Sequence, residues 1–116
     1  MDENMKNKFG TVKIADDAIM AIAGIAATDV PGVFSLEGGI TRDNVTTLDR
    51  KKLARCMKLN LSDQVIAIRM SVVVDGSETI PNVTHAIQQK VRDALEMMTG
   101  YTVSSVDVEI TGVRTS

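Results

Sequence analysis

Ten consecutive residues, 18–27, are all apolar or glycine, and no other feature limits the fold of this chain so strongly. Their alanine content and length favour a helix, and Asp16 and Asp17 before them suit the positive end of its dipole. A helix that covers one sheet face needs only an apolar stripe, so a helix that is apolar all round must be covered on further sides. A loop, a second copy of the chain or a partner protein could supply that cover. The candidate interface residues are Ile19, Ile22, Ala23, Gly24, Ala26 and Ala27.

The composition is that of one globular domain, with 116 residues of which 44% are hydrophobic and 24% charged. We expect a polar leader over residues 1–8, a single domain over 9–113 and a tail over 114–116. The single cysteine, Cys56, rules out an intrachain disulfide and favours a cytoplasmic setting. The N-terminus does not resemble a signal peptide. Residues 18–27 would rise only about 15 Å as a helix, too short to cross a bilayer.

Hydrophobic periodicity predicts the other elements. Residues 11–14 and 33–36 are strand candidates, and residues 37–49 have no clear period and predict a loop. Alternation over 57–61 and 66–74 predicts a hairpin, and alternation over 106–110 predicts a last strand. A second helix begins near Pro81 and stops at Gly100. Its apolar stripe consists of Val83, Ile87, Val91, Leu95 and Met98.

These elements predict a two-layer α+β domain with a mixed or antiparallel sheet and two helices, in the order β-α-β-β-β-α-β. Catalytic motifs are absent from the sequence. His85 falls away from the apolar stripe and is expected to face solvent, and a dyad with Cys56 has no support from spacing. Basic neighbours could lower the pKa of Cys56, but a small residue packed at a strand edge explains it better. We therefore expect no enzyme, no cofactor and no bound metal.

Residues 50–58 carry a local concentration of positive charge. Five of the 13 basic residues fall within these nine positions and no acid does, although the chain as a whole has a net charge of -2. Such a segment could bind phosphates, anionic lipid headgroups or an acidic partner, or it could be only a solvated loop and strand margin. The candidate contact residues are Arg50, Lys51, Lys52, Arg55 and Lys58.

Several short segments, in this order and spacing, resemble the alkaline shock protein family, the envelope-stress-response proteins of Gram-positive bacteria. The resemblance covers roughly residues 9–113. The segments that carry it are 10–15 (GTVKIA), 22–27 (IAGIAA), 30–33 (VPGV), 50–53 (RKKL), 72–74 (VVV), 80–83 (IPNV), 98–100 (MTG), 106–108 (VDV) and 111–113 (TGV).

The resemblance implies a small cytoplasmic α+β protein without known enzymatic activity. Relatives gather at the membrane by binding a separate integral membrane protein, are associated with cell-envelope homeostasis, and in some cases form higher assemblies. The family has no catalytic residues to carry over. This chain departs from it in its short tails and in having Cys56 where relatives often have a small residue such as glycine.

The leading hypothesis is a non-enzymatic interaction module of envelope stress response or homeostasis. It would form a homo-oligomer or dock on a membrane-bound partner protein, which would place it at the membrane without a span of its own. The main alternative is an RNA-binding module that uses the basic segment 50–58, although the chain has few aromatic residues and no GxxG loop. A third is a small-molecule or acyl-group binding domain with an aliphatic pocket.

Overall fold

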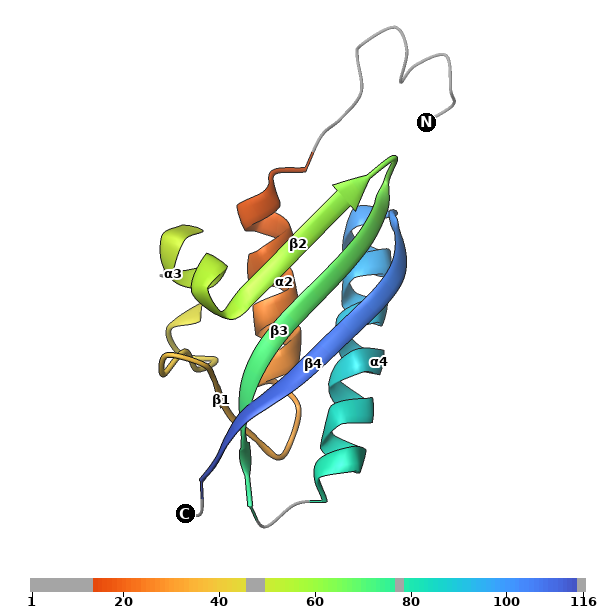
Figure 1. Cartoon of the computed structure of the whole chain (residues 1–116). Coiled ribbons are helices and arrows are strands. Elements are labelled where there is room, and N and C mark those ends of the chain that lie inside the picture. The colour runs from red at the N-terminus through yellow and green to blue at the C-terminus, as the bar shows by residue number, and fades with distance from the viewer. Residues whose placement is uncertain (1–13, 46–49, 77–78, 115–116) are drawn as a thin grey trace, which may run out of the picture.

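The computed structural model describes residues 14–45, 50–76 and 79–114, which form a helical layer against one face of a sheet (Figure 1). The predicted α+β class is confirmed. In chain order the elements are α2 (Asp16–Thr28), β1 (Val33–Leu36), α3 (Arg50–Cys56), β2 (Met57–Ser62), β3 (Val65–Asp75), α4 (Ile80–Thr99) and β4 (Thr102–Arg114).

The predicted order of elements differs from the structure, because the described residues include a helix, Arg50–Cys56, that was not predicted. Of the strand expected at 11–14, residues 11–13 lie outside the described residues, and Ile14 is not in a strand. No helix was predicted for the basic segment, and one interpretation made it a solvated loop and strand margin, but Arg50–Cys56 forms the short helix α3. This helix is anchored by Leu53 and Cys56, which are three residues apart and both buried. The order over the described residues is therefore α-β-α-β-β-α-β.

Strand β3 is the centre of the sheet. The predicted hairpin is confirmed, because β2 pairs antiparallel with the first half of β3 across a tight turn at Asp63 and Gln64. Strand β1 pairs antiparallel with the second half of β3. Strand β4 runs parallel to β3 along its whole length on the opposite side. The sheet is therefore mixed, and β4 forms one of its edges (Figure 1).

Two irregularities shape β4. Its register with β3 skips Ser104 and again Thr111. After each extra residue, the apolar side chains of β4 again point to the helix-covered face of the sheet. This explains why Val103 and Val106 are both buried although three positions separate them. Beyond the second irregularity, Val113 lies opposite the buried Val74 and continues the same face.

Helices α2 and α4 pack on each other and cover one face of the sheet. The stripe of α4 is confirmed for Val83, Ile87, Val91 and Leu95, which are all buried. Met98 does not belong to it, because it lies in the last helical turn beyond Leu95 and is 65% exposed. Gly100 ends the helix as predicted, in the left-handed conformation that glycine adopts most easily.

Candidate interaction surfaces

Helix α3 turns the basic segment into an ordered surface. Its two buried residues, Leu53 and Cys56, face the core, whereas Lys51, Lys52 and Arg55 are exposed. Arg50 begins the helix. A seven-residue helix has little stability of its own, so the burial of Leu53 and Cys56 is what holds these charges in place.

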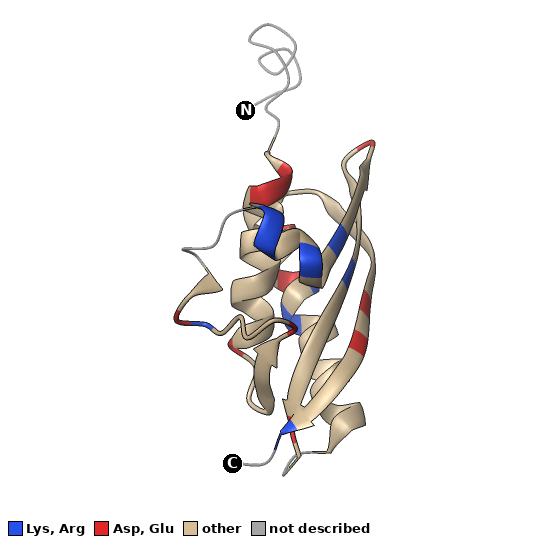
Figure 2. Cartoon of the chain, turned by 60° about the vertical axis from the view of Figure 1, so that its left-hand side comes forward, with Lys and Arg blue, Asp and Glu red and all other residues tan. Residues whose placement is uncertain are grey.

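The basic surface continues from α3 onto the uncovered face of the sheet. Lys58 of β2 lies directly opposite Arg69 of β3, and both side chains are exposed. A surface hollow of about 190 Å³ is lined by residues including Arg55, Lys58 and Arg69, and the one acid that lines it is Glu109. Glu109 pairs with Arg69 at 3.4 Å. Figure 2 shows the positive charges passing from α3 to the strands, with negative charges beyond them on β4.

We call this set the basic surface. Arg69 is not among the contact residues predicted from the sequence, although the alternation of β3 places it at an outward position. The structure brings Arg69 together with Arg55 and Lys58 around one hollow. The members of the basic surface are Lys51, Lys52, Arg55, Lys58 and Arg69.

A second hollow, of about 330 Å³, lies where α3 approaches the turn after β1. Gly38 and Gly39 in that turn have φ angles of +87° and +78°, so the turn requires residues that tolerate the left-handed conformation. Lys52 and Arg55 line the same hollow. These hollows open at the surface and have charged linings, whereas the space between sheet and helices holds buried residues such as Ile68 and Leu95.

The candidate interface helix is covered largely by its own chain. Ile19, Ala23 and Ala27 have no exposed surface, Ala26 is 5% exposed and Gly24 is buried. Helix α2 packs on α4, α3, β1 and β2. These elements bury the apolar surface that the sequence predicts to be covered on several sides. Of the six candidate residues only Ile22 is half-buried. Ile25, which is not among the candidate residues predicted from the sequence, is 38% exposed.

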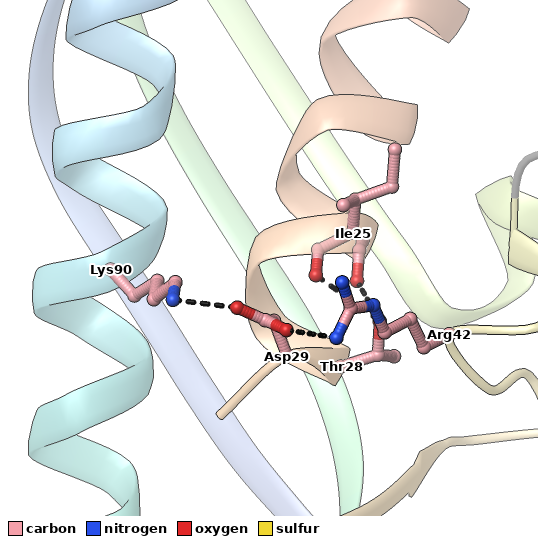
Figure 3. Close-up of polar contacts among 6 residues, drawn as sticks. Ile25, Thr28, Asp29, Arg42 and Lys90 are labelled. Atoms are coloured by element: carbon pink, nitrogen blue, oxygen red, sulfur yellow. Dashed lines mark hydrogen bonds and ion pairs between the residues drawn. The ribbon is translucent and has the colours of Figure 1, made fainter. Parts of the chain in front are cut away.

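A polar cluster closes the end of α2 (Figure 3). Asp29 accepts a hydrogen bond from Lys90 Nζ of α4 at 2.6 Å and pairs with Arg42 at 2.5 Å. Lys90 and Arg42 hold the pKa of the Asp29 carboxyl below its ordinary value. An acid at a helix C-terminus opposes the helix dipole, so the two cations offset an otherwise unfavourable charge. The cluster joins three separate segments and is a structural clamp.

Cys56 and His85 do not form a dyad. Cys56 is 3% exposed, and its Sγ donates a hydrogen bond to the Leu53 carbonyl oxygen at 3.3 Å. Burial raises the pKa of the Cys56 thiol to about 11, the opposite of what a reactive thiolate needs. His85 is exposed on α4, as predicted, and lines a hollow that Cys56 does not share. The suggestion that basic neighbours lower the pKa of Cys56 is therefore wrong, because burial raises this pKa and the charge of Glu37 raises it further.

Two features are absent from residues 14–45, 50–76 and 79–114. In this part of the chain, no group of three or more His, Cys, Asp and Glu side chains is arranged to hold a metal ion. Over the same residues, no helix has the length and apolar character needed to cross a bilayer.

The fold and its surfaces define a small two-layer α+β domain with exposed positive charge on α3, β2 and β3. The chain belongs to the alkaline shock protein 23 family, described by its cell envelope-related function, and the family model matches residues 4–115. The resemblance inferred from the sequence is thus confirmed.

Relatives in two genera are similar over most of the chain. The protein YqhY of Bacillus subtilis is 31% identical over 106 residues, which cover 91% of this chain and 78% of YqhY. YloU of the same organism is 28% identical, with 98% of this chain and 97% of YloU covered. Spy1614 of Streptococcus pyogenes is 27% identical over 98% of this chain and 96% of its own length.

Solved structures of MamM CTD variants share the fold. One has a TM-score of 0.53 at 19% identity and covers 84% of this chain and 98% of its own. A manganese form has a TM-score of 0.52, also at 19% identity, with 84% and 99% covered. At this level of identity the similarity concerns the fold alone.

Proposed function

We propose that this protein is a non-enzymatic interaction module that serves cell-envelope homeostasis. It docks through the basic surface on an acidic segment of a membrane-bound partner protein, and it self-associates. The family's cell envelope-related function supplies the cellular context. The observation that carries the proposal is the ordered concentration of exposed positive charge on α3, β2 and β3 of an otherwise acidic chain.

The geometry favours a specific protein contact over a diffuse attraction. Arg55, Lys58 and Arg69 surround one hollow, so an acidic side chain seated there meets several cations at once. Arg55 and Arg69 offer the planar, forked donors that bind carboxylates with two parallel hydrogen bonds. Leu53 and Cys56 fix the helix that presents Arg55, which lowers the entropy lost on binding.

The test is co-sedimentation with membrane vesicles from the cells that produce this protein. We expect the purified chain to sediment with these vesicles, and to fail to do so after the vesicles are treated with protease. Arg55→Glu and Lys58→Glu should each weaken binding, and the double variant should abolish it. Arg92→Glu is the matched control, because it reverses one exposed charge on α4 outside the basic surface.

Two parallel samples separate the other ligands. Protein-free liposomes with anionic lipids test direct attraction to headgroups, and single-stranded RNA tests the nucleic-acid alternative. Equal binding to liposomes, or binding to RNA that falls steeply with salt and depends on Arg55 and Lys58, would overturn the proposal. Membrane binding that survives the double variant would remove the basic surface from it.

A further inference from the structure

Strand β4 presents half of its outer edge without a partner in the described structure. The first half is closed by α4, because Gln88 Nε2 donates a hydrogen bond to the Val106 carbonyl oxygen at 3.0 Å. The Val103 N–H likewise donates to Glu96 Oε2 at 3.0 Å. No described group bonds to the outer edge of β4 after Val106.

The open half has a defined pattern of backbone and side chains. Because the peptide groups of Val103 and Val106 point away from β3, those of Val108 and Ile110 at alternate positions point the same way. Val108, Ile110 and Val113 lie opposite buried residues of β3 and share the helix-covered side. The other side of β4 is the uncovered face of the sheet. It carries Asp107, Glu109, Gly112 and Arg114.

We infer that this half of β4 pairs with the same segment of a second copy, antiparallel and about a two-fold axis at Ile110. This inference rests on the self-association in the proposed function. With Thr111 bulged in both strands, Val108 lies opposite Val113 of the second copy, and both are on the helix-covered side. On the uncovered face, Asp107 then lies opposite Arg114 of the second copy, twice per dimer. A single register therefore pairs apolar side chains on the helix-covered side and oppositely charged side chains on the uncovered face.

Gly112 supports the same register. A Cβ added there would meet only the Val73 methyl groups, at 3.5 and 3.6 Å, which is ordinary contact. Its φ angle is outside the left-handed region, so one copy alone does not require glycine. In the dimer, Gly112 faces Glu109 of the second copy and leaves room for that longer side chain. A glycine inside a strand often marks the close approach of another backbone.

Strand β2 offers a weaker alternative edge. It is shorter than the open part of β4, which runs over residues 107–114, and it carries Lys58, a residue type that discourages pairing at strand edges. Val113, in contrast, is 53% exposed although it is apolar, and pairing would cover it. The length, the exposed valine and the charge register all favour β4.

The test is a charge swap in the full chain, measured by sedimentation equilibrium over a wide range of concentration. Asp107→Arg and Arg114→Asp should each raise the dimer dissociation constant about tenfold, since each places two like-charged pairs opposite each other. The double variant Asp107→Arg/Arg114→Asp should return the constant to near that of the parent. Asp43→Lys, a charge reversal at an exposed residue between β1 and α3, should leave it unchanged, and thermal unfolding of each variant checks that it folds.

The outcomes separate this inference from the proposed function. A dimer that is insensitive to both single variants, or not restored by the swap, overturns pairing at β4 but leaves self-association through another surface. A folded chain that stays monomeric at every concentration overturns both β4 pairing and self-association. Docking on the membrane partner is judged separately, by the vesicle assay with the basic-surface variants.

Discussion

Gly24 is the residue at which the tight packing of α2 is most easily seen. A Cβ added to Gly24 would lie 2.7 Å from Val45 Cγ2 and 3.0 Å from Met57 Cε. Val45 is fully buried and branched at Cβ, so its methyl group has little freedom to move aside. The small residues in this helix thus allow close approach, but what approaches is the chain's own loop and strand.

We expect Gly24→Ala to lower the free energy of unfolding by about 1 kcal/mol. Overpacking of a core costs about 1–3 kcal/mol, which exceeds the gain of about 1 kcal/mol from replacing glycine in a helix. Urea unfolding measures the change. The control is Gly24→Ala/Val45→Ala, which should be more stable than the sum of the two single changes predicts. Strict additivity would show that Val45 does not limit the space.

Cys56 should behave as a core residue towards thiol reagents. Its thiol is buried and its pKa is raised to about 11, so almost no thiolate exists at pH 8. We expect labelling by a disulfide-exchange reagent to be slow in the native protein and to rise with urea along the unfolding curve. Fast labelling of the folded chain at pH 8 would contradict the packing described for α3.

At the scale of elements, the two residues of the β2–β3 turn adopt a backbone conformation that costs free energy for residues other than glycine. Asp63 and Gln64 have φ angles of +51° and +63°, the conformation of a two-residue turn that prefers glycine at its second position. The Gln64 carbonyl oxygen also accepts a hydrogen bond from the Thr102 N–H, and a glycine would keep that bond.

We expect Gln64→Gly to raise the free energy of unfolding by about 0.5 kcal/mol. The relief of left-handed strain, about 1–2 kcal/mol, exceeds the entropic cost of glycine, about 0.5–1 kcal/mol. The measurement is the urea midpoint at constant slope. Ser62→Gly, in the adjoining strand, should have the opposite sign.

The elements with a strong period could be predicted from the sequence, and the short ones could not. Met57, Ile68 and Val72 belong to a clear alternation, and the stripe of α4 held from Val83 to Leu95. Helix α3 was missed because only two of its seven residues, Leu53 and Cys56, face the core, too few to show a period. The irregularities at Ser104 and Thr111 carry no composition signal, because pairing with β3 alone defines them.

The candidate surfaces, too, could be predicted from the sequence only in part. The sequence supplied the basic residues of 50–58, because charge density is visible along the chain. It did not supply Arg69, which reaches the same hollow only through the pairing of β2 with β3. Nor could it decide whether Ile19 and Ala23 face a partner, since the elements that bury them lie far apart in sequence.

At the scale of the whole molecule, the Asp29 clamp links α2, α4 and the segment that carries Arg42. Folding favours the charged carboxylate, because its pKa is lowered from 3.8. The clamp therefore stabilises the fold above that ordinary value and is lost as the pH falls through the lowered pKa. Since Lys90 and Arg42 are both substantially exposed, salt should weaken it.

We expect Asp29→Asn to lower stability modestly at neutral pH and to have a smaller effect as the pH falls below 4. Thermal unfolding of the parent and the variant at several pH values measures this convergence. Asp93→Asn serves as the control, because Asp93 is an exposed acid on α4 that forms no ion pair with another described residue. Parallel curves with a constant offset would contradict a role for the ionised carboxylate.

Because β4 is an edge strand of the sheet, pairing of two copies at β4 would affect how strongly the protein binds its partner. A two-fold axis perpendicular to the sheet would leave Lys58 and Arg69 of both copies on the same side of one continuous, doubled sheet. Two tethered acidic segments in a membrane could then be held at once by a single dimer. Such bivalent attachment multiplies residence time without any new contact, so weak individual docking would suffice to keep the protein at the envelope.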